Sequence, residues 1–192
     1  MAETGLRERA KARRRAAIVR AAYELFAERG YDATTVADIA EAAEVAPRTV
    51  AMYFPSKQDI ALSRFSEAAG GLGQALRGRP AGESYPATIG RWLRSLDDRP
   101  DEVALRELAR RMFVANPQLR ALRAGRMTSS IDDGARLIAE ETGADPGDPG
   151  PRLVAVATAA IVDEIAFLPP GPDREGAIDV AVRFLEAGIS AL

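Results

Sequence analysis

The stretch TTVADIAEAAEVAPRTVAMYFPSK, from Thr34 to Lys57, contains two short helical patterns separated by only a few residues. In the first pattern, Ile39 and Ala40 lie on one apolar face at helical spacing. In the second, Pro47 suits the first position of a helix, and Val50 provides an apolar anchor. Two short helices joined by a tight turn predict a helix-turn-helix.

The residues around this unit predict where its helices begin and end. Either Thr34 or Thr35 can cap the first helix of the pair. Pro55 ends the second helix, because proline in a helix interior removes a hydrogen bond. Ser56, followed by Asp59, is a cap signal for a further helix that we expect to run from Lys57 to about Leu76.

The second helix of the pair has a face that its apolar anchor does not use. Arg48, Thr49 and Met52 lie on this face. A helix that enters the major groove of DNA needs such side chains in its first turns, where they reach the edges of the bases. Small helical bundles without DNA-binding activity also contain pairs of short helices, and Met52 can alternatively pack under its own helix. The pattern therefore favours DNA binding without requiring it.

Charge is distributed unevenly along the chain. The total net charge is −2, but residues 1–64 carry 11 Lys and Arg against 9 Asp and Glu, whereas residues 65–192 carry 15 against 19. The first twenty residues contain seven basic side chains and only two acidic ones. A basic end on an acidic body suggests binding to a polyanion at that end. The alternative is that these arginines form the solvated start of a helix.

Composition argues against several other classes of protein. The chain contains no cysteine and no histidine, so the most common nucleophile, general base and metal ligands are missing, and we expect no catalytic residues, metal or cofactor. The longest apolar run, LVAVATAAIV, has ten residues, whereas a membrane span needs about 20. The N-terminus is charged rather than apolar, unlike a secretory signal. We expect a cytoplasmic protein with no membrane partner.

The segment AAYELFAERGYDATTVADIAEAAEVAPRTVAMYFPSKQDI, residues 21–60, resembles the DNA-binding domain of TetR-type transcriptional regulators. The resemblance implies an all-α fold with a DNA-binding domain over residues 12–72, its helix-turn-helix over 35–54, and a helical ligand-binding and dimerisation domain over 77–192. It also implies a homodimer that binds double-stranded operator DNA and a small-molecule effector. Glu44, Ala46 and Ala51 depart from the family pattern, which leaves open a scaffold or small-molecule-binding protein with a degenerate helix-turn-helix.

The resemblance also implies roles for individual residues. Arg48, Thr49 and Met52 are expected to contact bases. Tyr53 and Lys57 match positions that commonly contact phosphates, although Tyr53 can also be a core tyrosine. Thr34 and Thr35 are further predicted DNA contacts, and Thr35 can donate to a phosphate, with capping alone as the alternative. Arg13, Arg14 and Arg15 are expected to reach phosphates or the minor groove from a mobile N-terminus.

After residue 76, clusters of Gly, Pro and Asp divide the chain into predicted helices at 84–97, 101–115, 117–142, 151–168 and 173–191. The helix at 151–168 is apolar on nearly all sides, so it must be covered on both faces. Following the resemblance, we expect the last two helices to pair with their copies in a second subunit. The residues predicted at this interface are Ala157, Ala160, Ile161, Ile178, Val182 and Leu185. Burial within one subunit is the alternative.

Several large side chains on the middle helices are candidates for an effector pocket, with core packing as the alternative for each. They are Trp92, Met112, Phe113, Met127, Ile131, Asp163 and Phe167. The segment RRMFVANPQLRAL resembles the C-terminal domains of some members of the same family that bind lipophilic or acyl-thioester ligands. The predicted function is a dimeric repressor that a lipophilic ligand releases from a palindromic operator. An enzyme using carboxylates in the C-terminal region is a further alternative.

Overall fold

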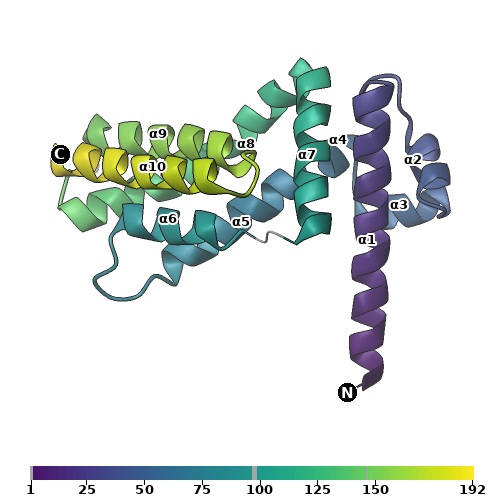
Figure 1. Cartoon of the computed structure of the whole chain (residues 1–192), viewed down its shortest axis with the longest axis horizontal. Coiled ribbons are helices and arrows are strands. Elements are labelled where there is room, and N and C mark those ends of the chain that lie inside the picture. Colours follow the sequence, from purple (N-terminus) through teal and green to yellow (C-terminus); the bar gives the residue numbers. More distant parts are fainter. Residues whose placement is uncertain (1, 97–98, 146) are drawn as a thin grey trace. The chain divides into compact units, whose positions relative to one another are not determined.

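The computed structural model describes residues 2–96, 99–145 and 147–192, and every regular element in these ranges is a helix (Figure 1). The predicted all-α class is confirmed. The helices are α1 (Ala2–Glu28), α2 (Val36–Ala42), α3 (Pro47–Tyr53), α4 (Lys57–Ala61), α5 (Ser63–Arg77), α6 (Tyr85–Arg94), α7 (Pro100–Ala115), α8 (Pro117–Thr142), α9 (Pro149–Ala166) and α10 (Pro172–Ser190). None of the helices in the described ranges is both long and apolar enough to cross a bilayer.

Most helix ends follow local signals. Proline occupies the first turn of α3, α6, α9 and α10, where its missing N–H has no intrahelical partner to lose. The five helices predicted after residue 76 correspond closely to α6–α10. The predicted end of the first of them, at residue 97, lies outside the described residues.

The helix predicted from Lys57 to Leu76 is wrong in one respect, because the structure divides it at Leu62 into α4 and α5. The N–H of Arg64 would bond to the carbonyl of Ile60 in a continuous helix. Here it donates to the buried hydroxyl of Tyr23 on α1, over 3.4 Å. A side chain distant in sequence therefore supports the break, and no glycine or proline marks it locally.

The described residues form two compact units. The first contains the residues up to Ser66 together with Ala104–Leu122, and the second contains Glu67–Val103 and Arg123–Leu192. The segment 104–122, which the sequence places with the C-terminal domain, thus clusters with the N-terminal helices. By sequence, the first unit carries fifteen Lys and Arg against ten Asp and Glu, a net charge of +5, and the second carries a net charge of −7. The difference in net charge between the two units is therefore larger than the difference between residues 1–64 and residues 65–192.

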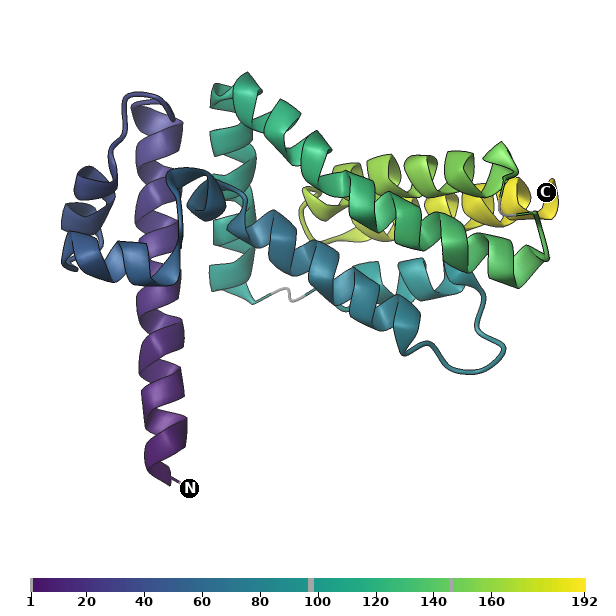
Figure 2. The ribbon, with the colours of Figure 1, turned by 180° about the vertical axis from the view of Figure 1, so that it is seen from behind.

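The first unit is built around α1. In both views α2 and α3 lie on one side of α1 and α7 on the other, and the N-terminal part of α1 extends past them (Figures 1 and 2). The core begins at Ile18, and its fully buried side chains come from all four N-terminal helices: Ile18, Ala22, Tyr23, Phe26, Ile39, Val50 and Ile60. Burial of these residues fixes the orientation of the short helices, which are too short to be stable in isolation.

The second unit is a helical bundle in which α6, α9 and α10 contact one another. Its core includes Tyr85, Ile89 and Trp92 from α6, together with Ile178 and Leu185 from α10. A glycine, Gly90, lies where α6 approaches α10. Trp92 is the single tryptophan of the chain and lies in this core. Its fluorescence therefore reports on the bundle rather than on the N-terminal helices.

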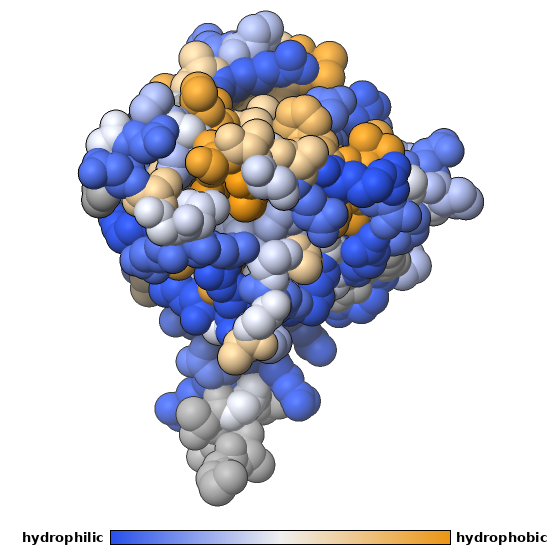
Figure 3. Space-filling view, turned by 90° about the vertical axis from the view of Figure 1, so that its left-hand side faces the viewer, coloured by the Kyte–Doolittle hydropathy of each residue, from blue (hydrophilic) through white to orange (hydrophobic). Residues whose placement is uncertain are grey.

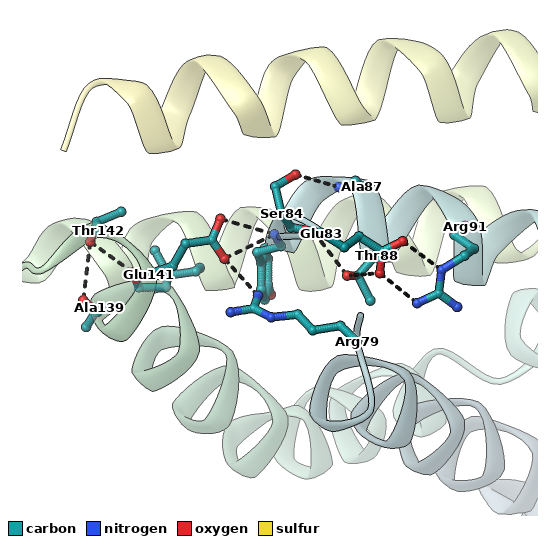
Figure 4. A network of polar contacts seen from close by, with 11 residues as sticks. Arg79, Glu83, Ser84, Ala87, Thr88, Arg91, Ala139, Glu141 and Thr142 are labelled. Carbon is teal, nitrogen blue, oxygen red and sulfur yellow. Dashed lines mark hydrogen bonds and ion pairs between the residues drawn. The ribbon is translucent and has the colours of Figure 1, made fainter. Parts of the chain in front are cut away.

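A polar network joins the loop before α6 to the end of α8 (Figure 4). Glu83 accepts hydrogen bonds of 2.8 Å from the hydroxyl of Thr88 and from Nε and Nη2 of Arg91. Glu141 accepts from Nη1 of Arg79 over 2.7 Å and from the N–H of Tyr85. The hydrogen bonds from Arg91 and Thr88 lower the pKa of Glu83 to about 2.

Candidate nucleic-acid interface

Helix α3 has one buried and one exposed face. Val50 is 1% exposed and Phe54, which follows the helix, is 5% exposed, so these two side chains attach α3 to the core. Met52 is 75% exposed, Arg48 is exposed, and Thr49 and Tyr53 are half-buried. The side chains predicted to contact bases therefore point away from the residues that anchor the helix.

Helix α2 begins with a complete capping box at Thr35, one of the two threonines predicted to cap it. Asp38 N–H donates to the hydroxyl oxygen of Thr35 over 3.1 Å, while the Thr35 N–H and hydroxyl donate to the Asp38 carboxylate over 2.7 and 2.6 Å. These bonds lower the pKa of Asp38. Because the hydroxyl proton of Thr35 is directed to Asp38, the structural role of Thr35 is to cap α2.

The turn between α2 and α3 contains an unusual backbone conformation. Glu44 has a φ of +53°, in the left-handed region that non-glycine residues rarely adopt. Its position is one of the departures from the family pattern. At the next departure, the N-cap Ala46 provides no side-chain hydrogen bond, although Pro47 follows it. Helices α2 and α3 thus form despite the departures at Glu44 and Ala46.

Thr34 was predicted to contact DNA, and the structure corrects this assignment. Its side chain is 1% exposed, and its hydroxyl donates to the carbonyl of Gly30 over 2.8 Å. The hydroxyl is therefore inside the turn between α1 and α2. Two adjacent threonines look equivalent in the sequence, but only one of them faces solvent.

Lys57 contacts the turn between α1 and α2. Its Nζ donates to the carbonyl of Tyr31 over 2.6 Å and to that of Thr34 over 2.8 Å, and lies 4.3 Å from the centroid of the Tyr31 ring. Two of the three ammonium protons are thus used within the protein. The side chain predicted as a phosphate contact has a clear structural role, which any test of DNA binding must separate.

The basic residues near the N-terminus lie inside α1 rather than in a mobile arm, so the expected mobile N-terminus is wrong over the described residues. Arg13 and Arg14 are exposed. The guanidinium carbon of Arg15 lies 4.9 Å from the centroid of the Phe54 ring. Arg15 therefore packs against the end of α3, and Arg13 and Arg14 present their charge on the surface of a helix.

Asn116, at the corner between α7 and α8, was missed by the sequence analysis. It is 2% exposed. Its Oδ1 accepts from the N–H of Tyr31 over 2.6 Å, and its Nδ2 donates to the carbonyls of Phe26 and Met112, each over 2.8 Å. The only local signal is an Asn-Pro pair between two predicted helices, which is an ordinary turn signal.

The residues predicted to line an effector pocket do not all belong to one unit. Met112 and Phe113 are buried in the first unit, so their grouping with the others is not supported. In the second unit, Asp163 forms an ion pair with Arg123, whose guanidinium carbon lies 5.3 Å from the Phe167 ring centroid. The remaining candidates of that unit are buried or half-buried: Trp92, Met127 and Ile131.

The predicted dimer residues fall into different environments. Ile178 and Leu185 are 0% and 1% exposed, so they are corrected to core residues of the second unit. Ile161 and Val182 pack partly against that core, Ala157 is half-buried, and Ala160 is exposed. Ile178 and Leu185 lie on the inward stripe of α10, and periodicity identifies such an apolar face without showing what covers it.

Other apolar residues of the same helices are exposed. Leu153 and Val156 on α9 are 66% and 45% exposed, and Val180 and Phe184 on α10 are 57% and 59% exposed. Apolar side chains also gather in one area of the surface drawn in Figure 3. Exposed apolar surface of this kind is typical of protein interaction sites.

Comparisons with known proteins agree with the geometry of the first unit. Residues 18–63 match the model of "Bacterial regulatory proteins, tetR family". The chain is 36% identical over 166 residues to the HTH-type transcriptional regulator TcmR of Streptomyces glaucescens, covering 82% of this chain and 73% of that relative.

Solved structures share the fold over nearly the whole chain. FadR of Thermus thermophilus, a TetR-family transcriptional repressor in complex with lauroyl-CoA, is 27% identical, with a TM-score of 0.55 over 91% of this chain and 94% of that chain. NalD of Pseudomonas aeruginosa, the secondary repressor of the MexAB-OprM multidrug efflux pump, is 20% identical, with a TM-score of 0.59 over 94% and 97%.

Proposed function

Since the chain belongs to the tetR family of bacterial regulatory proteins, which are non-enzymatic DNA-binding transcriptional regulators, we propose that it is a dimeric repressor that a small lipophilic molecule releases from a palindromic operator. The observation that carries this proposal is the exposed face of α3. Arg48 and Met52 extend from it into solvent while Val50 holds the helix on the core. Such a helix can enter a major groove without losing its own anchor.

Charge supports the same face as the site of DNA binding. The unit that contains α3 has a net charge of +5, although the whole chain has a net charge of −2. A locally positive unit attracts phosphates, and the negative second unit does not compete for them. Arg13 and Arg14 add exposed positive charge from α1.

Operator selection from a random DNA pool tests this function. We expect the selected sequences to be inverted repeats whose half-sites are about 10 base pairs apart, because two major grooves on one face of B-DNA are separated by about 34 Å. Affinity for both selected and random DNA should fall as salt rises. Selection of a single unrepeated half-site, or affinity that does not depend on salt, contradicts the proposal.

The exposed apolar residues of α9 and α10 support a second copy of this chain as the partner. Leu153, Val156 and Ala160 recur at i, i+3 and i+7 on α9, and Val180 and Phe184 at i and i+4 on α10. Each set forms a stripe on a helix whose opposite side belongs to the core. We assign the dimer interface to these stripes, with Ala157 at the edge, in place of Ile178 and Leu185.

An effector of lipophilic character is supported by the second unit and by one relative. The half-buried pair of Met127 and Ile131 lies on α8, the helix that also carries Arg123. Arg123, paired with Asp163, provides a charged group beside the Phe167 ring. The FadR structure contains lauroyl-CoA, an acyl thioester. We therefore place the effector site in the second unit, without Met112 and Phe113.

Trp92 fluorescence provides the test for the effector. Lipophilic compounds and acyl thioesters are screened for a change in Trp92 emission, and the affinity of the protein for its selected operator is then measured with and without each hit. We expect at least one hit to weaken operator binding by about 5- to 150-fold, the usual range of coupling between two sites. If every tight-binding compound leaves operator affinity unchanged, release by an effector is excluded, while DNA binding stands.

A further inference from the structure

We propose that Asn116 is a positioning residue for operator recognition, acting through the backbone of Tyr31 rather than through contact with DNA. The inference rests on the proposed function, because it assigns to the α7–α8 corner a role in reading the operator. Asn116 is 85 residues from Tyr31 in the sequence, and both belong to the first unit.

The side chain of Asn116 makes three hydrogen bonds to backbone groups. Its carbonyl oxygen accepts from Tyr31, and its two amide hydrogens are directed to Phe26 at the end of α1 and to Met112 on α7. A buried amide that makes three hydrogen bonds to different backbone groups holds its partners in one geometry, because loss of any of these bonds leaves a buried polar group unpaired. Asn116 therefore fixes the backbone where α1 leads into the next turn.

The same peptide segment is held from a second direction. The carbonyl of Tyr31 accepts from Nζ of Lys57, which also bonds to the carbonyl of Thr34. Asn116 holds the N–H of Tyr31 and Lys57 holds its carbonyl oxygen, each over 2.6 Å. Two side chains, one from the corner between α7 and α8 and one from α4, thus determine the path of the chain through one residue.

This turn determines where the recognition unit begins. Thr34 closes it through Gly30, and Thr35 caps α2 directly after it. Helices α2 and α3 contact each other, so a change in the start of α2 also moves the exposed face of α3. A small displacement of that face affects base contacts, which require well-aligned hydrogen bonds, more than phosphate contacts, which depend mainly on charge.

The test compares Asn116→Leu with Asn116→Asp in the full-length protein. The first variant removes the acceptor for the Tyr31 N–H, and the second keeps an oxygen at that position while losing amide hydrogens. Binding to the selected operator and to random DNA is measured for each variant at a temperature at which it remains folded. Hydrogen exchange of the Tyr31 amide is followed in parallel in the absence of DNA.

We expect Asn116→Leu to weaken operator binding about tenfold while changing affinity for random DNA less than about twofold, and to accelerate exchange of the Tyr31 amide. Asn116→Asp should recover part of the operator affinity. A purely structural role predicts that both affinities fall by the same factor, and that result overturns the proposal. Unchanged operator affinity in Asn116→Leu overturns it as well.

A double-mutant comparison keeps the test decisive if Asn116→Asp does not fold. Lys57→Met removes the second bond to Tyr31, and we expect the double variant with Asn116→Leu to bind the operator more tightly than the product of the two single losses predicts, since both act on one peptide. Independent losses contradict the proposal. If the wild-type protein selects no operator, the proposed function fails, whereas the exchange rates still show whether Asn116 holds Tyr31.

Discussion

Gly90 on α6 faces Val182 on α10 so closely that a Cβ atom added to Gly90 would lie 2.7 Å from Cγ2 of Val182. This distance is shorter than normal contacts between carbon atoms, and the branched side chain of Val182 cannot rotate away freely. The pair therefore sets how closely the two helices pack. It also explains why Val182, predicted at a dimer interface, packs partly against the core of its own unit.

Gly90→Ala should consequently destabilise the second unit. We expect overpacking to cost about 1–3 kcal/mol, offset by about 1 kcal/mol of improved helix propensity. Denaturant unfolding followed by Trp92 fluorescence measures the net loss. Gly176→Ala on α10 is the matched control, because nothing lies within 4 Å of the added Cβ, and it should raise stability. Equal stabilisation by both changes would show that the helices separate without cost.

The Glu83 network predicts a pH dependence. The pKa of Glu83 is lowered to about 2 from an ordinary value of 4.5, so its contribution to stability is fully present above pH 4.5 and is lost as the pH falls toward 2. Thermal unfolding of the wild type and of Glu83→Gln should therefore differ most at neutral pH and converge in acid. A difference in stability between the two proteins that grows below pH 4 would contradict stabilisation by the ionised Glu83.

The left-handed backbone of Glu44 predicts that glycine is better at this position. Glu44→Gly should stabilise the protein by up to about 1 kcal/mol, because glycine adopts positive φ without strain, although its greater freedom in the unfolded chain reduces the gain. Glu41→Gly, inside α2, is the control and should destabilise by about 0.5–1 kcal/mol. Differential scanning calorimetry measures both changes. Destabilisation by Glu44→Gly would show that the left-handed conformation of Glu44 is not strained.

Substitutions of Arg48 and Lys57 should have different effects, the first on base recognition and the second on stability. Arg48→Ala should cost about 1–3 kcal/mol on the selected operator, relax preference at one base pair per half-site, and leave stability unchanged because Arg48 is exposed. Lys57→Met should lower the melting temperature, since it removes the bonds to Tyr31 and Thr34. Binding across an operator library and thermal unfolding distinguish the two. Equal base preference in Arg48→Ala would remove Arg48 from base recognition.

Phe184 offers a direct test of the proposed dimer. Phe184→Glu should convert dimers to monomers, because a charge buried at an interface without a partner costs several kcal/mol, and the monomer should stay folded since Phe184 is 59% exposed. Analytical ultracentrifugation reports the change. Val114→Glu, at a residue that is 55% exposed on α7, is the control and should leave the dimer intact. A Phe184→Glu variant that remains dimeric would place the interface elsewhere.

The sequence alone determined the features that depend on neighbouring residues. The cap at Ser56, the proline at the start of α3 and the apolar anchor at Val50 are all visible from residues within one or two turns of each other, whereas the sequence left the cap of α2 open between Thr34 and Thr35. Hydrogen bonds between residues three apart, and apolar residues at helical spacing, are visible in a linear chain. For the same reason the helix-turn-helix and most helix boundaries were predictable.

The tertiary structure decided the features that depend on contacts between distant segments. Periodicity identified apolar faces on α9 and α10 but could not assign Ile178 to the core and Phe184 to the surface, because both are apolar and only the neighbouring helices distinguish them. The break at Leu62 depends on Tyr23, and the place of 104–122 in the positively charged unit accompanies the bonds of Asn116 to the end of α1. Such partners lie 41 to 90 residues apart, where hydrogen bonding leaves no repeating pattern in the sequence.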